Sequence, residues 1–160
     1  MDRMPLLALF LQAIPEGLIL ITLGLVLAGV RPRLVPVGVV AVGESVAMYF
    51  IRSLPIPFGV HTLCGLGIIA AGLRFLVPLT WRTAFLAAVL GGISVLAAES
   101  LGLPLVTALF GVSREALLAN AWLRVTLPLP YEAALAVLAW VCWRHRWSVL
   151  ARDEEGRGGP

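Results

Sequence analysis

Four glutamates, each inside an otherwise apolar stretch, are the residues of this chain with the clearest chemical potential. They are Glu16, Glu44, Glu99 and Glu132. A carboxylate in such a stretch costs about 2.5–3.5 kcal/mol on scales of membrane insertion, so each one requires a physical reason. Carboxyl groups in that setting bind protons, cations or polar ligands, or they pair with arginines. We therefore treat these four positions as candidate ligand- or proton-binding residues.

Arg52 and His61 are the basic candidates, and they flank the connection between the second and third apolar stretches. The topology derived below places them at the same membrane face as Glu99 and Glu132. An imidazole titrates near neutral pH, so such a cluster would suit recognition of a polar ligand. The same residues would equally suit ion pairs and hydrogen bonds that only stabilise the fold.

Glu44 and Glu16 lie in different settings within their stretches. Glu44 is the deepest of the acids, and we expect its partner on another helix, because the adjacent Ser45 diverges from it on a helical surface. Glu16 directly follows Pro15, which should kink its helix and free a carbonyl one turn earlier. A structural alternative exists for each acid. Glu16 could pair with an arginine or a hydroxyl, and Glu132 could be a first-turn carboxylate favoured by the helix dipole.

The composition excludes a soluble domain. The 160 residues are 60% hydrophobic and only 13% charged, and the mean hydropathy is +0.97. A bilayer core of about 30 Å is crossed by about 20 helical residues, and the apolar stretches approach that length. We predict one integral membrane helical domain over 1–150 and a disordered cytoplasmic tail over 151–160, which is too short, charged and glycine-rich to bury a core.

The predicted fold is an all-α polytopic bundle with about five transmembrane helices and one short interfacial helix. The expected spans are 5–30, 34–51, 60–77, 83–101 and 126–143. The segment 103–111 is apolar but is followed by charged residues, so a re-entrant loop is an alternative there. Ser113 is typical of a helix N-cap, and the residues after it alternate in a pattern that indicates an amphipathic helix lying in the interface.

The basic residues, all of them arginines, determine the orientation. With the N-terminus outside and five spans, eight arginines fall inside and four outside, which favours this topology in a cytoplasmic (inner) bacterial membrane. The inside set is Arg31, Arg33, Arg74, Arg82, Arg144, Arg146, Arg152 and Arg157. The outside set is Arg3, Arg52, Arg114 and Arg124. Because the arginines flank apolar stretches rather than forming one basic face, no nucleic-acid partner is expected.

No catalytic or metal-binding pattern is present in the sequence. Cys64 and Cys142 lie in apolar stretches without a CxxC or a His/Cys cluster, so we expect packing roles, no metal and no cofactor. No Ser/His/Asp, Cys/His or glycine-rich phosphate motif indicates an enzyme. Small residues recur at helical spacing and predict close helix packing. They are Ala13, Gly17, Gly24 and Ala28 in the first span, Gly65 and Gly72 in the third, and Ala84, Ala88 and Gly92 in the fourth.

Two stretches together resemble a known family. The sequences LQAIPEG at 11–17 and YFIRSLPIPFGVHT at 49–62 are similar to the membrane sensor region of accessory-gene-regulator-type sensor histidine kinases of Firmicutes. The resemblance covers about 11–74. It implies a multi-span bundle that dimerises and responds to an extracellular or membrane signal. No kinase module follows here, so it implies a stand-alone sensor that needs a partner. The positions it singles out are Glu16, Arg52, Pro55, Gly59 and His61.

These observations favour a non-enzymatic membrane sensor or accessory protein. It would sense a signal through its polar intramembrane residues and relay the signal to a membrane or cytoplasmic partner, as a homo-oligomer or in a complex. Two alternatives remain open. One is a small oligomeric transporter that conducts protons or cations through the glutamates. The other is a structural subunit of a larger membrane complex.

Overall fold

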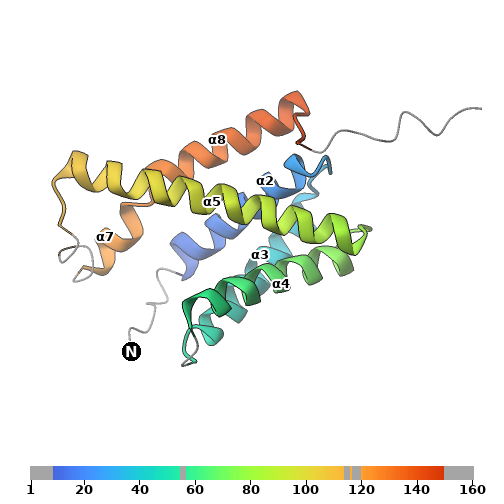
Figure 1. Ribbon diagram of the computed structural model, residues 1–160, viewed down its shortest axis with the longest axis horizontal. Helices are drawn as coiled ribbons and strands as arrows, with labels where there is room; N and C mark the ends of the chain where they lie inside the picture. The colour runs from blue at the N-terminus through green and yellow to red at the C-terminus, as the bar shows by residue number, and fades with distance from the viewer. Residues whose placement is uncertain (1–8, 55–56, 114–115, 117–119, 150–160) are drawn as a thin grey trace, which may run out of the picture.

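A computed structural model shows an all-helical molecule over the residues it describes, which are 9–54, 57–113, 116 and 120–149 (Figure 1). The helical segments are η1 (Leu9–Ala13), α2 (Ile14–Leu27), α3 (Leu34–Ile51), α4 (Phe58–Leu76), α5 (Trp81–Phe110), α7 (Ala121–Thr126) and α8 (Leu129–His145). The predicted all-α bundle is thereby confirmed. Pro5, Pro55 and the tail 151–160 lie outside the described residues.

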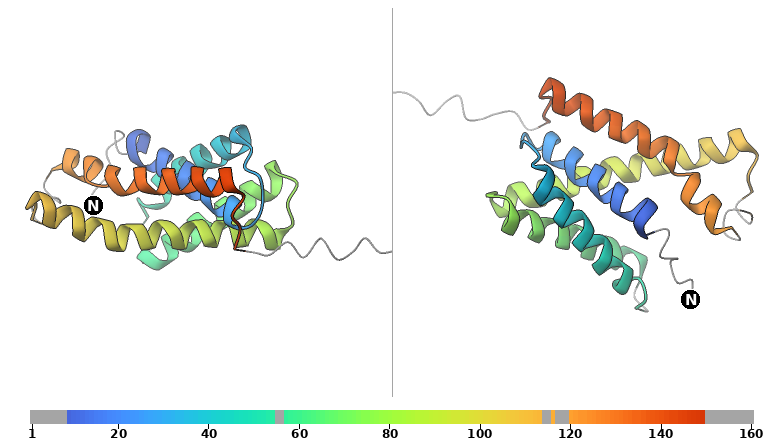
Figure 2. Two further views of the ribbon diagram at one scale, coloured as in Figure 1. Left: turned by 90° about the horizontal axis from the view of Figure 1, so that it is seen from above. Right: turned by 180° about the vertical axis from the view of Figure 1, so that it is seen from behind.

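Helix α2 is the centre of the bundle. It packs against α3, α5 and α8, while α4 packs against α3 and α5. Successive long helices run in opposite directions, so the starts of α2, α4 and α8 share one end of the bundle with the end of α3 (Figures 1 and 2). The other end carries the α2–α3 connection, the α4–α5 connection and the last turn of α8.

Four helical segments are long and apolar enough to cross a membrane. They are Leu9–Leu27, Leu34–Ile51, Gly59–Leu76 and Trp81–Phe110. Helix α8 has 17 residues, and at a rise of 1.5 Å per residue it is about 25 Å long, close to a bilayer core of about 30 Å. Its direction and its packing on α2 and α5 fit the predicted fifth span.

The closest helix contact joins α2 and α5 backbone to backbone. A Cβ added at Gly24 would collide with the carbonyl oxygen of Ala87, and one added at Gly91 would collide with the carbonyl oxygen of Leu20. Lipid provides no hydrophobic drive between helices, so close van der Waals approach is the main source of packing energy. The two glycines therefore fix the crossing point of the two central helices.

Other small residues mark the neighbouring interfaces. An added Cβ at Gly17 would lie 3.5 Å from Cβ of Ala41, which places Gly17 against α3. One at Gly72 would lie 2.9 Å from Cγ1 of Val40, so α3 and α4 also meet at a glycine. Of the predicted small-residue positions, Gly17 and Gly24 in the first span and Gly65 and Gly72 in the third thus lie within helix contacts.

The start of the first span departs from α geometry beside Pro15. Residues Leu9–Ala13 form a π-helical turn, and α2 continues from Ile14 with Pro15 in its first turn. Proline cannot donate the backbone hydrogen bond of a regular helix, and wide turns of this kind accompany such interruptions. The irregular backbone therefore occurs where the sequence predicts a kink.

The fourth span is longer than predicted. Instead of ending at 101, α5 continues through Pro104 to Phe110 and ends at Gly111, whose φ of 63° is left-handed. The helix does not end at 101, and the segment 103–111 does not form the re-entrant loop that was the alternative there. Pro104 removes one backbone donor, but the hydroxyl of Thr107 donates to the carbonyl of Leu103 at 2.9 Å and binds the turn together.

The interfacial helix expected after Ser113 is only partly within the described residues. The hydroxyl of Ser113 accepts a hydrogen bond from the backbone N–H of Ala116 at 3.2 Å, as an N-cap does. Positions 114–115 and 117–119 are not described. A separate short helix, α7, follows, and the side chain of Asn120 caps it by accepting from the N–H of Trp122 at 2.9 Å.

Candidate functional site

Three glutamates from three helices converge at one end of the bundle. Glu16 lies in the first turn of α2, Glu132 in the first turn of α8 and Glu99 within α5. Glu16 lies within electrostatic range of both other carboxyls, with Glu132 the stronger influence. We call Glu16, Glu99 and Glu132 the acidic cluster, and the end that carries them the acidic end.

Prolines and helix packing place these side chains. Pro15 stands directly before Glu16 and Pro130 two residues before Glu132, each in the first turn of a helix, where a proline is well tolerated. Since α2 and α8 run in the same direction and pack along each other, their first turns bring Glu16 and Glu132 to one level. Helix α5 packs against both, and it supplies Glu99.

The cluster extends from the surface into the bundle. Glu99 is exposed, Glu16 is partly buried and Glu132 is only 5% exposed. A carboxyl group removed from solvent in this way is costly unless a proton, a cation or a polar partner accompanies it. Glu132 is therefore the member whose charge state most strongly affects the surrounding packing.

Tyr131 belongs to the same site and was not singled out from the sequence. Its side chain lies within electrostatic range of the acidic cluster. Its ring stacks on the backbone of Gly102, where an added Cβ would approach Cβ of Tyr131 to 2.7 Å. Two signals in the sequence point to this residue. Tyr131 precedes Glu132, and Gly102 follows Glu99 by one helical turn.

Arg52 and Glu44 extend the polar region along α3. Arg52 caps the end of α3, and it lies within electrostatic range of Glu16 and of Glu44. Glu44 faces α4, with its Oε1 3.3 Å from the position of an added Cβ at Gly65. Ser45 is buried, with its hydroxyl near Gly17 of α2, and this hydroxyl also donates to Oε2 of Glu44 at 3.5 Å. The expectation that Ser45 is no partner of Glu44 is therefore wrong, although this hydrogen bond is long.

His61 stands apart from the acidic cluster. It lies in the first turns of α4, and its Nδ1 is buried without a hydrogen-bond partner among the described residues. It is not among the groups that act electrostatically on Glu16 or Glu132. His61 nevertheless lies at the start of α4 and so shares the acidic end with Glu99, Glu132 and Arg52, while Glu16 and Tyr131 join the two acids there (Figure 1).

The geometry does not assemble a metal centre from the described part of the chain. No group of three or more His, Cys, Asp or Glu side chains is close enough there to hold one metal ion. Cys64 and Cys142 are free thiols. The three carboxyl groups are near enough to influence one another but are not arranged to bind one metal ion together. Such an arrangement suits binding of protons or of weakly held cations.

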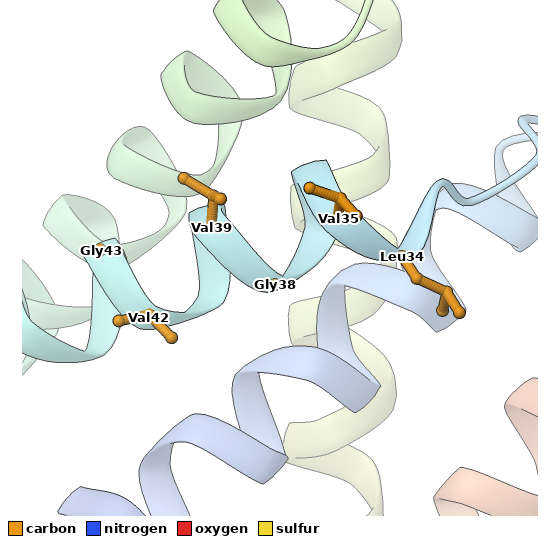
Figure 3. A pocket seen from close by; sticks show the side chains of 6 residues that line it. All are labelled: Leu34, Val35, Gly38, Val39, Val42 and Gly43. Carbon is orange, nitrogen blue, oxygen red and sulfur yellow. The ribbon is translucent and has the colours of Figure 1, made fainter.

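A shallow apolar groove runs along the outer face of α3 (Figure 3). Its lining is Leu34, Val35, Gly38, Val39, Val42 and Gly43. An added Cβ at Gly38 or at Gly43 would have no heavy atom within 4 Å. The groove carries no candidate polar residue, so it has no part in the chemistry of the acidic cluster.

The fold and the site define a class of protein, a multi-pass membrane helix bundle in which the central helix and two of its neighbours contribute a carboxyl cluster at one end. Comparison of the chain with protein-family models, curated proteins and solved structures finds no match. The residues of this chain alone therefore support the functional proposal that follows.

Replacement of Gly102 tests the contact that holds Tyr131 beside the acids. Gly102→Ala should destabilise the protein by about 1–3 kcal/mol, because the new methyl group meets the Cβ of Tyr131 rather than a flexible side-chain end. Thermal unfolding in detergent measures the effect. The matched control is Gly67→Ala, at a helical glycine with open space around it. Equal stability of the two variants would contradict this contact.

Proposed function

We propose that this protein is a non-enzymatic membrane sensor or accessory subunit whose helix packing responds to the charge of the acidic cluster. The observation that supports the proposal is the convergence of Glu16, Glu99 and Glu132 from three different helices. Binding of a proton or a cation among them reduces their mutual repulsion. The relative positions of α2, α5 and α8 are thereby coupled to a signal at the acidic end.

The central crossing supports a mechanical relay. Glu16 stands eight residues before Gly24, or about 12 Å along the helix axis at 1.5 Å per residue. At Gly24 the backbone of α2 rests on the backbone of α5. A displacement of the N-terminal part of α2, which carries Glu16, therefore tilts the helix about this contact. A ligand shifts the equilibrium between two helix packings only if it binds one of them more tightly. A proton or cation would do so here if the carboxyl groups lie closer together in one packing than in the other.

A contact at the end of the bundle opposite the acidic cluster would transmit the signal to the C-terminal segment. The backbone N–H of Val149, just beyond α8, donates to the carbonyl of Leu27 at the end of α2, with an N–O distance of 2.9 Å. Movement of α2 would thus reach the segment that leads into the tail. A partner on that side of the membrane would read the change, with the N-terminus outside and the C-terminus inside.

The test is a distance measurement between helices. Spin labels on cysteines introduced at Phe10 and at Leu101, both exposed, report the separation between η1, which leads into α2, and α5 in nanodiscs. With Cys64 and Cys142 replaced by alanine, we expect a change of about 1–2 Å, typical of helix shifts, between alkaline and acidic buffer. The double variant Glu16→Gln/Glu132→Gln should abolish this change.

Two results would contradict the sensor proposal. One is a spin-label distance that stays constant across the pH series and with added cations in the protein that retains all three glutamates. The other is a pH-dependent change of the same size in the double glutamine variant. Co-purification of a stoichiometric partner from the native membrane without any such response would favour the structural-subunit alternative.

A small oligomeric transporter is the second candidate, and the position of Glu44 favours it. Glu16 lies within electrostatic range of Glu44, so acidic groups extend from the acidic end toward the middle of α3. A proton or cation path would use such a series. Proton flux into proteoliposomes that is lost in Glu44→Gln would replace the sensor proposal with this one.

A further inference from the structure

The end of the bundle opposite the acidic cluster carries only basic charge among the described residues. Its arginines are Arg31, Arg33, Arg74, Arg82, Arg144 and Arg146. The four described acidic residues lie on α2, α3, α5 and α8 away from this end. We call it the basic end. Guanidinium groups clustered at one end of a membrane helix bundle attract phosphate groups.

An apolar groove begins directly beside two of these arginines. Arg31 and Arg33 are exposed in the α2–α3 connection, and the groove on α3 opens at Leu34 and Val35, immediately after Arg33 (Figure 3). It continues for about 13 Å, to Gly43, at the helical rise of 1.5 Å per residue. A positive group at the mouth of an apolar groove matches a molecule with an anionic head and a long hydrocarbon chain.

The last turn of α8 adds positive charge near the same connection. The hydrogen bond from Val149 to Leu27 holds the segment after α8 against the end of α2. Arg146 adopts a left-handed φ of 56° at the turn that makes this approach. Arg144 and Arg146 are exposed, and they strengthen the field around Arg31 and Arg33.

We propose that this surface binds an anionic phospholipid, with its phosphate at Arg31 and Arg33 and one acyl chain in the groove along α3. Arginine forms bidentate hydrogen bonds with phosphate oxygens. The two open glycines, Gly38 and Gly43, make the helix surface hollow where the chain lies. Free phosphate would use the arginines but leave the groove empty, so the groove favours the lipid.

Native mass spectrometry of the full chain in detergent tests the site, with phosphatidylglycerol and phosphatidylcholine of identical chains as probes. We expect preferential retention of phosphatidylglycerol. Arg31→Gln/Arg33→Gln should weaken its binding by about fivefold per arginine removed. The double substitution Arg74→Gln/Arg82→Gln, which removes equal charge from the same end, should have a smaller effect. Gly38→Leu, which fills the groove, should also weaken binding and leaves every charge in place.

Four outcomes would overturn the proposal. These are equal retention of the two lipids, equal effects of the two double substitutions, full binding by Gly38→Leu, and displacement of phosphatidylglycerol by inorganic phosphate at comparable concentration. Disulfide-linked dimers formed through a cysteine at Val39 in membranes would instead assign the groove to a second copy of the chain. A variant that fails to fold is recognised by its thermal unfolding, and lipid binding is then judged on the remaining variants.

Discussion

Gly24→Ala should destabilise the bundle, whereas Gly38→Ala should leave it equally stable or make it more stable. Both replacements add one methyl group to a helical glycine, and alanine in a helix interior is intrinsically favoured over glycine by roughly 0.5–1 kcal/mol. At Gly38 the methyl group meets open space. At Gly24 it collides with the carbonyl oxygen of Ala87, which a side-chain rotation cannot move.

The intrinsic gain of alanine applies at both glycines and cancels, so the expected difference between the two variants is the overpacking cost of about 1–3 kcal/mol. Denaturation of the detergent-solubilised protein, followed by circular dichroism and tryptophan fluorescence, measures it. Gly91→Ala should behave like Gly24→Ala because it meets the carbonyl oxygen of Leu20. Gly24→Ala with unchanged stability would mean that α2 and α5 do not cross at these residues.

Helix positions followed from the sequence wherever an apolar stretch ended at a strong signal. The range predicted for the second span is the range of α3, because Arg33 and Arg52 bound it. The fourth span was underestimated because the charged residues that follow the apolar segment 103–111 led us to separate that segment from the span. Within α5 the helix passes through Pro104, and the left-handed Gly111 ends it seven residues later.

The site was predictable residue by residue but not as an assembly. The apolar context identified all four glutamates, and a count of spans placed Glu99 and Glu132 at one end. The addition of Glu16 and Tyr131 depends on which helices are neighbours. Gly24 and Gly91 let α2 and α5 cross closely, and α2 also packs against α8, whereas α4 packs against α3 and α5. Periodicity within one helix does not contain this information.

Glu132→Gln should preserve or raise the stability of the protein while abolishing the pH-dependent change in helix separation. The glutamine has nearly the same shape as the glutamate, which is 5% exposed, and it removes the cost of burying an ionisable group. We expect a change in the free energy of unfolding between zero and about +2 kcal/mol, within the range for relieving a buried polar group. Thermal unfolding and the spin-label distance are measured on the same preparation.

The sign of that stability change distinguishes two roles for the Glu132 carboxyl group. In one it responds to pH, and in the other it stabilises the fold through an ion pair. If Glu132 were half of a buried ion pair that holds α8 in place, its removal would cost about 3–5 kcal/mol, because the partner would be left buried and unpaired. Glu99→Gln is the matched control on the exposed side of the cluster, where the side chain is not enclosed by protein. It should alter both the stability and the response less than Glu132→Gln. A protein that loses several kcal/mol of stability in Glu132→Gln yet still changes its helix separation with pH would show that Glu132 stabilises the fold and that the response arises elsewhere.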